Sequence, residues 1–97
     1  MAVKTLQITQ TGSAVQVAAS STFARWIIFQ NIAAAVMTVG DSAVTATNGA
    51  VLPASNAANS TLLLPALSES SAHYDLAQWY TIGTSTQKLN IVYDSMN

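Results

Sequence analysis

The chain has 97 residues, of which 51% are hydrophobic and only 7% are charged, and its formal net charge is −1. Ordinary soluble domains carry about 25% charged residues, so hydroxyl and amide side chains must keep this surface in solution. We interpret the composition as a surface largely covered by partners; the alternative is a small Ser/Thr-rich β-domain that is simply soluble.

What the sequence lacks excludes several classes of function. Three fixed cations cannot neutralise a phosphate backbone or form an electrostatic membrane site, so we expect no nucleic-acid and no membrane partner. Cysteine is absent, which excludes disulfides and thiolate metal sites. The N-terminal segment lacks the apolar core of a signal peptide, and the longest apolar run, residues 32–37, is too short to span a bilayer. We expect one domain over residues 1–97, made as a soluble chain without an export signal.

The chain begins with two segments that alternate as half-buried strands do. Residues 3–10 place Leu6 and Ile8 on one face and polar side chains on the other. Residues 14–19 form a second short strand, after a turn that contains Gly12.

Residues 23–29 are apolar on both faces, which predicts a central strand that is covered on both sides or faces a neighbouring subunit. Arg25 lies within it, and a buried guanidinium must be paired, so we expect either an ion pair with an acid such as Asp94 or Asp75, or a side chain that extends to the rim of the sheet; an ion pair is preferred to a ligand-binding role. Strict alternation predicts the following two faces for this strand: Phe23, Ile27 and Phe29 on one side, and Trp26 and Ile28 on the other.

The next segment predicts a loop, a strand and a tight hairpin. Residues 31–39 contain three consecutive alanines but no capping box, so we expect a loop followed by a strand that reverses at Asp41. Asn48-Gly49 is the preferred pair for a two-residue turn with positive φ. This hairpin would have the following opposed residues: Thr47 and Ala50, Ala46 and Val51, and Thr45 and Leu52.

The second half of the chain predicts three more strands. A polar loop at residues 54–60 leads to a strand at 61–64, which Pro65 ends because proline cannot donate to a ladder. Residues 73–82 alternate as one strand, and 83–87 form a five-residue hairpin loop. The last strand has the following inward residues: Leu89, Ile91 and Tyr93.

These elements predict the fold class. About eight short strands, with a turn every eight to twelve residues, are typical of an all-β, single-domain β-sandwich or jelly roll with antiparallel strands. We expect the following residues to be mainly buried, in the core of the fold or in a subunit contact: Trp26, Ile28, Leu76, Tyr80, Ile82, Leu89 and Ile91.

Residues with catalytic or metal-binding chemistry are sparse. Ser42, Asp41 and His73 could suggest a hydrolase, but the second glycine of a nucleophile elbow is missing and no strand-to-helix turn follows. We expect no enzyme and interpret Asp41 as a turn residue whose carboxylate accepts from backbone N–H groups. His73 and Asp75 could supply two metal ligands, whereas a structural zinc site needs four, so we predict no catalytic, cofactor-binding or metal site and no cofactor.

The aromatic residues raise a different possibility, since exposed rings can stack on sugars. Core packing is the preferred explanation for most of them, and an exposed cluster would favour glycan binding. The residues concerned are Trp26, Trp79, Tyr74, Tyr80 and Tyr93.

The order and spacing of several motifs resemble small all-β virion structural proteins of tailed bacteriophages. The motifs are WIIFQN at 26–31, MTVGDSAVT at 37–45, GAVLP at 49–53, DLAQWYTIG at 75–83 and KLNIVY at 88–93. In this group a strand ends in a Val-Gly-Asp-Ser turn, and a later Tyr-x-Ile-Gly strand pairs with a terminal apolar strand. The match covers about two thirds of the chain, residues 23–53 and 75–94, and departs from the group at 54–74.

The resemblance implies a capsid decoration (cement) or head-fibre protein on the virion surface, made in the host cytoplasm. Such a protein binds the assembled shell through contacts between subunits and stabilises it. Its expected partners are the major capsid protein or other virion proteins and further copies of itself, as a homo-oligomer (dimer or trimer). The alternative from a different class is a receptor- or glycan-binding β-module of a tail or head fibre.

Overall fold

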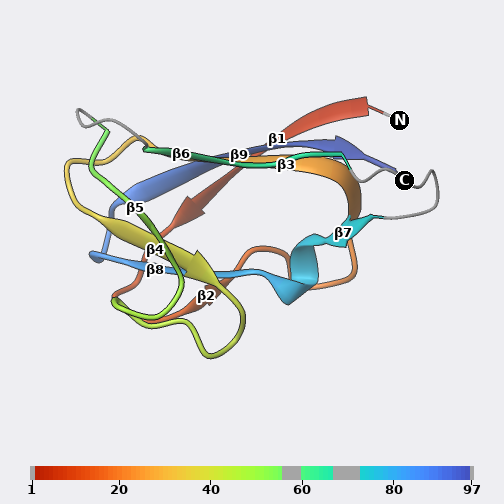
Figure 1. Cartoon of the computed structure of the whole chain (residues 1–97). Helices are drawn as coiled ribbons and strands as arrows, with labels where there is room; N and C mark the ends of the chain where they lie inside the picture. Colours follow the sequence, from red (N-terminus) through yellow and green to blue (C-terminus); the bar gives the residue numbers. More distant parts are fainter. Residues whose placement is uncertain (1, 56–59, 67–72, 97) are drawn as a thin grey trace.

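The computed structural model describes residues 2–55, 60–66 and 73–96, which form nine β-strands and one turn of 3-10 helix. The strands make two antiparallel sheets packed face to face (Figure 1). Sheet A has the order β1 (Ala2–Thr9), β9 (Lys88–Ser95), β3 (Phe23–Asn31) and β6 (Thr61–Leu64), and the short β7 (Tyr74–Asp75) also pairs with β3. Sheet B has the order β2 (Val15–Gln16), β8 (Tyr80–Gly83), β4 (Met37–Gly40) and β5 (Ala50–Leu52).

The strand pairing is that of a jelly roll. With the short β7 left aside, the first strand pairs with the last, the second with the second from last, and so on inward to β4 with β5. Pairing of β9 with β3 and of β8 with β4 then completes the two sheets. This is the double-sheet architecture of jelly rolls, and the predicted all-β sandwich or jelly roll is confirmed.

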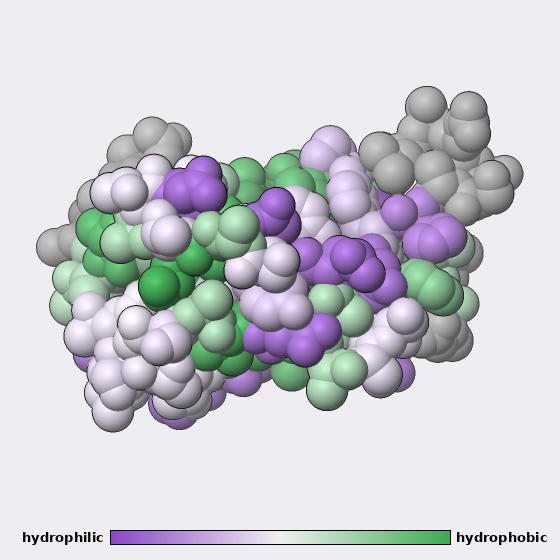
Figure 2. Space-filling model, turned by 90° about the horizontal axis from the view of Figure 1, so that it is seen from below, coloured by the Kyte–Doolittle hydropathy of each residue, from purple (hydrophilic) through white to green (hydrophobic). Residues whose placement is uncertain are grey.

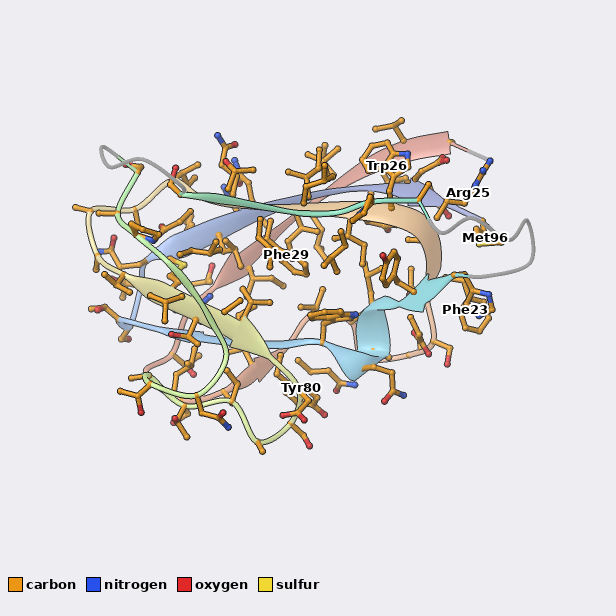
Figure 3. The ribbon with its side chains drawn as sticks, viewed as in Figure 1. Phe23, Arg25, Trp26, Phe29, Tyr80 and Met96 are labelled. Carbon is orange, nitrogen blue, oxygen red and sulfur yellow. The ribbon has the colours of Figure 1, made fainter. Side chains whose placement is uncertain are left out.

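The core lies between the two sheets and is made by the inward residues of alternating strands. Ile8 of β1 is buried, as the alternation predicts, and so are Leu89, Ile91 and Tyr93 of β9. Figure 3 shows Phe29 of β3 between the two layers. The cluster contains the following residues: Ile8, Val17, Ala24, Ile27, Phe29, Ala33, Met37, Val39, Leu52, Leu76, Leu89, Ile91 and Tyr93.

The predicted faces of β3 are wrong at its start. The register against β9 shifts between Ala24 and Ile27, and the extra residue of such a bulge reverses the alternation. Ala24 and Ile27 are therefore fully buried, while Phe23 is 36% exposed. Arg25 lies within the bulge and is partly exposed, and its ion pair with Asp94 or Asp75 stays a prediction.

The predicted core is correct only in part. Leu76, Leu89 and Ile91 are fully buried. The other four predicted core residues are only partly buried, because they lie on the outer faces of β3 and β8 or in the bulge. They are Trp26, Ile28, Tyr80 and Ile82.

The predicted Asn48-Gly49 hairpin is wrong. Thr45 and Asn48 exchange backbone hydrogen bonds of 3.1 and 3.2 Å, so the turn lies two residues earlier, with Ala46 and Thr47 at its centre, and β5 pairs with β4 instead. Gly49 does have a positive φ of 138°. A Cβ atom there would lie 2.7 Å from the carbonyl oxygen of Val39, so glycine is needed for a close approach to β4.

The strand predicted over residues 73–82 is interrupted. The 3-10 turn η1 (Leu76–Gln78) separates β7 of sheet A from β8 of sheet B. Asp75 caps this turn, since its side chain accepts from the backbone N–H of Ala77. The predicted hairpin loop at 83–87 is also wrong, because β8 and β9 belong to different sheets and the loop crosses between them.

The β6 edge agrees with its prediction. The strand covers Thr61–Leu64 and lies at the edge of sheet A, with Pro65 directly after it. The polar loop predicted at 54–60 falls mostly on residues 56–59, which lie outside the described residues.

Candidate functional site

The outer face of sheet A carries a row of side chains that crosses all of its four main strands. Thr5 of β1 is opposite Val92 of β9, and Val92 is also opposite Ile28 of β3. Ile28 in turn is opposite Leu63 of β6. Because their sequence neighbours point into the core, these four side chains face away from sheet B.

This row is the centre of what we call the apolar outer face, defined as Val3, Trp26, Ile28, Leu63 and Val92. Val3 is 63% exposed and Leu63 is 56% exposed, and the other three are partly buried. Figure 3 shows Trp26 on the outer side of sheet A, opposite in direction to Phe29. Clustered apolar side chains on one exposed face are typical of interaction surfaces.

A second row beside it consists of amide and hydroxyl side chains. Gln7, Asn90, Gln30 and Thr61 stand opposite one another across the same four strands. The Gln7 amide Nε2 donates to Asn90 Oδ1 at 2.9 Å. A shallow hollow of about 440 Å³ lies between this row and the apolar one. These groups offer neutral donors and acceptors to a partner.

Charged side chains stand at the ends of these strands. Lys88 is paired with Thr9 at one end, and its Nζ donates to Thr9 Oγ1 at 3.1 Å. Asp94 is paired with Val3 at the other end. The two central rows contain only neutral residues, so a partner that covers them need not desolvate a charge.

The outer face of sheet B is partly covered by the chain itself. Residues 41–49, which connect β4 to β5, fold back over it, and Thr38 Oγ1 donates to the carbonyl oxygen of Ala46 at 3.2 Å. As a result Thr38 is only 1% exposed, and Val44 of the same connection is 5% exposed. From the side of sheet B, hydrophobic surface shows only as patches between neutral and hydrophilic residues (Figure 2).

A depression of about 430 Å³ lies where this connection meets η1, lined in part by Asp41, Asn48, Gln78 and Trp79. Asp41 Oδ1 accepts from the backbone N–H of Ala43 at 2.9 Å, which confirms its predicted role in the turn. The Trp79 ring is tilted against Phe29 with ring centroids 5.7 Å apart. One aromatic side chain beside three polar ones is the kind of lining that can bind a small hydroxylated ligand.

Two buried polar residues hold the scaffold of the site, and no sequence pattern predicts either of them. Asn31, at the end of β3, is 1% exposed. Its Nδ2 donates to the carbonyl oxygens of Ala35, Leu52 and Pro53, and its Oδ1 accepts from the Ala33 N–H. Gln10 is also 1% exposed, and its Nε2 donates to Thr81 Oγ1 at 2.9 Å. Each of these two side chains therefore links a segment of sheet A to a strand of sheet B.

Asp75 has a similar structural role where the chain leaves sheet A. Its carboxylate accepts from the backbone N–H groups of Thr22 and Ala77, each at 3.0 Å. These two bonds, in that order, lower the pKa of Asp75 from its usual 3.8, because they stabilise the charged form.

The residues considered for catalysis lie apart in the fold. Ser42 and Asp41 follow β4 of sheet B. His73 precedes β7 of sheet A, where its ring lies 4.5 Å from the Phe23 ring. Within residues 2–55, 60–66 and 73–96, no three His, Asp or Glu side chains group as metal ligands would.

The described part of the chain has no helix that is long and apolar enough to cross a membrane. Comparisons with known proteins add no relative: no protein-family model, no curated protein and no solved structure matches this sequence. The surfaces described above therefore carry the functional argument.

Proposed function

We propose that this protein is a non-enzymatic structural protein of a phage virion that decorates the capsid and stabilises the assembled shell. The observation that carries the proposal is the outer face of sheet A. This face carries two rows of uncharged side chains across four strands. Val3 and Leu63 on the same face are more than half exposed. In the described part of the chain, residues 41–49 cover part of the corresponding face of sheet B, around Thr38.

The physical mechanism is contact burial. Each square ångström of apolar surface removed from water contributes about 25 cal/mol of transfer free energy, which must exceed the cost of lost freedom on association. A ligand that binds only the assembled lattice shifts the equilibrium toward that lattice. Repetition of the same weak contact over a symmetric shell adds avidity without new contacts.

Two further observations support the proposal by analogy. The sequence motifs resemble those of phage virion proteins in their order and spacing. The jelly-roll topology found here occurs in viral capsid and lectin domains. Because a fold does not determine a function, the proposal depends on the surface and its test.

The test mixes the purified chain with shells assembled from the coat protein of the phage that encodes it. Binding is measured by co-sedimentation at low salt and at about 0.5–1 M salt, where exposed charge pairs are largely screened. We expect binding at both salt concentrations and a higher temperature of shell disassembly. The proposal fails if the chain does not co-sediment at either salt concentration.

The alternative function is a receptor- or glycan-binding module, and the depression beside Trp79 is the observation that favours it. That function predicts a cluster of exposed aromatic rings, whereas three of the rings labelled in Figure 3 lie apart. Phe29 lies between the sheets, while Trp26 and Tyr80 lie on opposite outer sides. Binding to a bacterial surface glycan, together with no binding to shells, would establish this alternative.

A further inference from the structure

We propose that two copies of this chain associate by pairing their β1 strands edge to edge. β1 has eight residues and stands at the end of sheet A, where β9 is its neighbour. The other sheet edges in the described chain are shorter: β6 has four residues before Pro65, β5 has three and β2 has two. A long edge without proline or bulge is a template for another strand.

The pairing of β1 with β9 determines which backbone N–H and C=O groups of β1 point to the open edge. The Gln10 N–H donates to the carbonyl oxygen of Gln87, on the β9 side. Successive residues of an antiparallel strand point their backbone groups to alternate sides, so even-numbered residues of β1 face β9. The backbone groups that point to the open edge belong to Val3, Thr5, Gln7 and Thr9. All four residues are exposed. Their N–H and C=O groups have no backbone partner among the described residues.

One register between the two β1 strands gives hydrogen-bond partners to all of these backbone groups. Antiparallel pairing about a two-fold axis at Leu6 sets Thr5 of one copy opposite Gln7 of the other, and Val3 opposite Thr9. Every edge-facing pair then exchanges both backbone hydrogen bonds. The two Leu6 residues meet on the core side, where each one already packs against the core of its own copy.

Charge disfavours the neighbouring register centred on Thr5. Lys4 is the only charged residue of β1, and in the register centred on Leu6 it stands opposite Ile8 of the second copy. The two Lys4 positions are then about 14 Å apart along the strand, at about 3.4 Å per residue, which exceeds the Debye length of about 10 Å at 0.1 M salt. A register centred on Thr5 would halve that separation, to about 7 Å.

The dimer would also enlarge the proposed docking surface, a consequence that rests on the proposed function. An axis perpendicular to the sheet leaves both apolar outer faces on the same side. Four strands at about 4.8 Å spacing and seven residues at about 3.3 Å give roughly 440 Å² of projected face per copy. A standard interface buries about 800 Å² per partner. Two joined faces reach that size, whereas one does not.

The first test uses the chain alone and is independent of any shell. Sedimentation equilibrium should give twice the chain mass, and Leu6→Cys should form an interchain disulfide on mild oxidation. Opposed Cα atoms of such a pair are about 4.5 Å apart, within the range for a disulfide. Lys4→Cys is the matched control on the same side of β1, and it should not cross-link at about 14 Å. The absence of native cysteine makes either product unambiguous.

The second test removes one edge donor. Thr5→Pro deletes an N–H that faces the open edge and should shift the chain to monomer, while Thr5→Ala keeps that N–H and should remain dimeric. Circular dichroism checks that both variants are folded. A wild-type chain that stays monomeric at about 1 mM, or a dimer that gives no Leu6→Cys disulfide, overturns the proposal. If the wild type were monomeric and still bound shells, the dimer would be refuted and the proposed function would be retained.

Discussion

The outer faces of the two sheets differ in what covers them. Over sheet B, residues 41–49 fold back so closely that Thr38, an outward residue of β4, is 1% exposed. Over sheet A, Leu63 on the outer side of β6 is 56% exposed, and Val3 on β1 is 63% exposed. Sheet B is thus partly covered by a segment of its own chain, although Val51 on β5 is 51% exposed, whereas Val3 and Leu63 of sheet A are exposed further. Under the proposed function, sheet A is therefore the side that a partner covers.

The inner and outer sides of β9 give the largest expected contrast. Ile91 points into the core and is fully buried, while its neighbour Val92 belongs to the apolar outer face. Ile91→Ala should lower the free energy of unfolding by about 2–5 kcal/mol, because it leaves a cavity. Val92→Ala should cost less than about 1 kcal/mol. Urea unfolding of both variants measures the difference, and equal losses would contradict the inward assignment of Ile91.

The connection between the sheets at Asn31 should be nearly as sensitive. Asn31→Ala removes the amide that binds the carbonyl oxygens of Leu52 and Pro53. Leaving such buried groups unsatisfied should cost about 2–3 kcal/mol. Gln30→Ala, at the exposed neighbouring position, should stay within about 0.5 kcal/mol of the wild type. An Asn31→Ala protein as stable as Gln30→Ala would show that this amide does not hold the crossing.

Gly49→Val should loosen the cover of sheet B. Its Cβ would lie 2.7 Å from the Val39 carbonyl oxygen and 2.8 Å from Thr38 Cγ2, at a φ of 138°. Strain of this kind costs about 1–3 kcal/mol. Amide hydrogen exchange should show faster exchange in residues 41–49 with little change in β9. An unchanged melting temperature would contradict the close packing of this connection.

Asp75 should give the smallest effect, visible through pH. Its pKa in the folded protein lies below the usual 3.8, so its stabilisation is present above that value and is lost as pH falls through the lowered pKa. Asp75→Asn lacks this titration. The stability difference between wild type and Asp75→Asn should therefore shrink as the pH is lowered from about 5 to 2. A difference that stays constant over this range would exclude the Asp75 contribution.

The sequence predicts the inward sides of the strands well where alternation is regular. Leu89, Ile91 and Tyr93 are buried as predicted, and so is Ile8. The prediction fails at β3 because a bulge adds a residue, and the bulge leaves no composition signal that separates Ala24 from Phe23. It fails again at residues 73–82, where capping by Asp75 stops one strand and turns the chain toward the other sheet.

The candidate site depends on facts that alternation alone does not contain. Trp26 and Ile28 look like core residues by hydrophobicity, but strand order and register decide that Ile28 joins Leu63 and Val92 on an outer row. Likewise, Asn48-Gly49 favours a tight turn locally, whereas tertiary packing against Val39 sets the φ of Gly49. In both cases, contacts between residues far apart in the sequence determine the conformation.

The most direct measurement of the central claim compares two substitutions of exposed apolar residues on opposite sheets. Leu63→Lys places a charge in the apolar outer face of sheet A, while Val51→Lys does so on β5 of sheet B, where the side chain is 51% exposed. Both variants are tested for co-sedimentation with the assembled shells used to test the proposed function. Because burying an unpaired charge is costly, we predict that Leu63→Lys binds at least about tenfold more weakly, while Val51→Lys binds like the wild type. Equal binding by the two variants, or loss with Val51→Lys alone, would contradict the assignment of sheet A as the docking side.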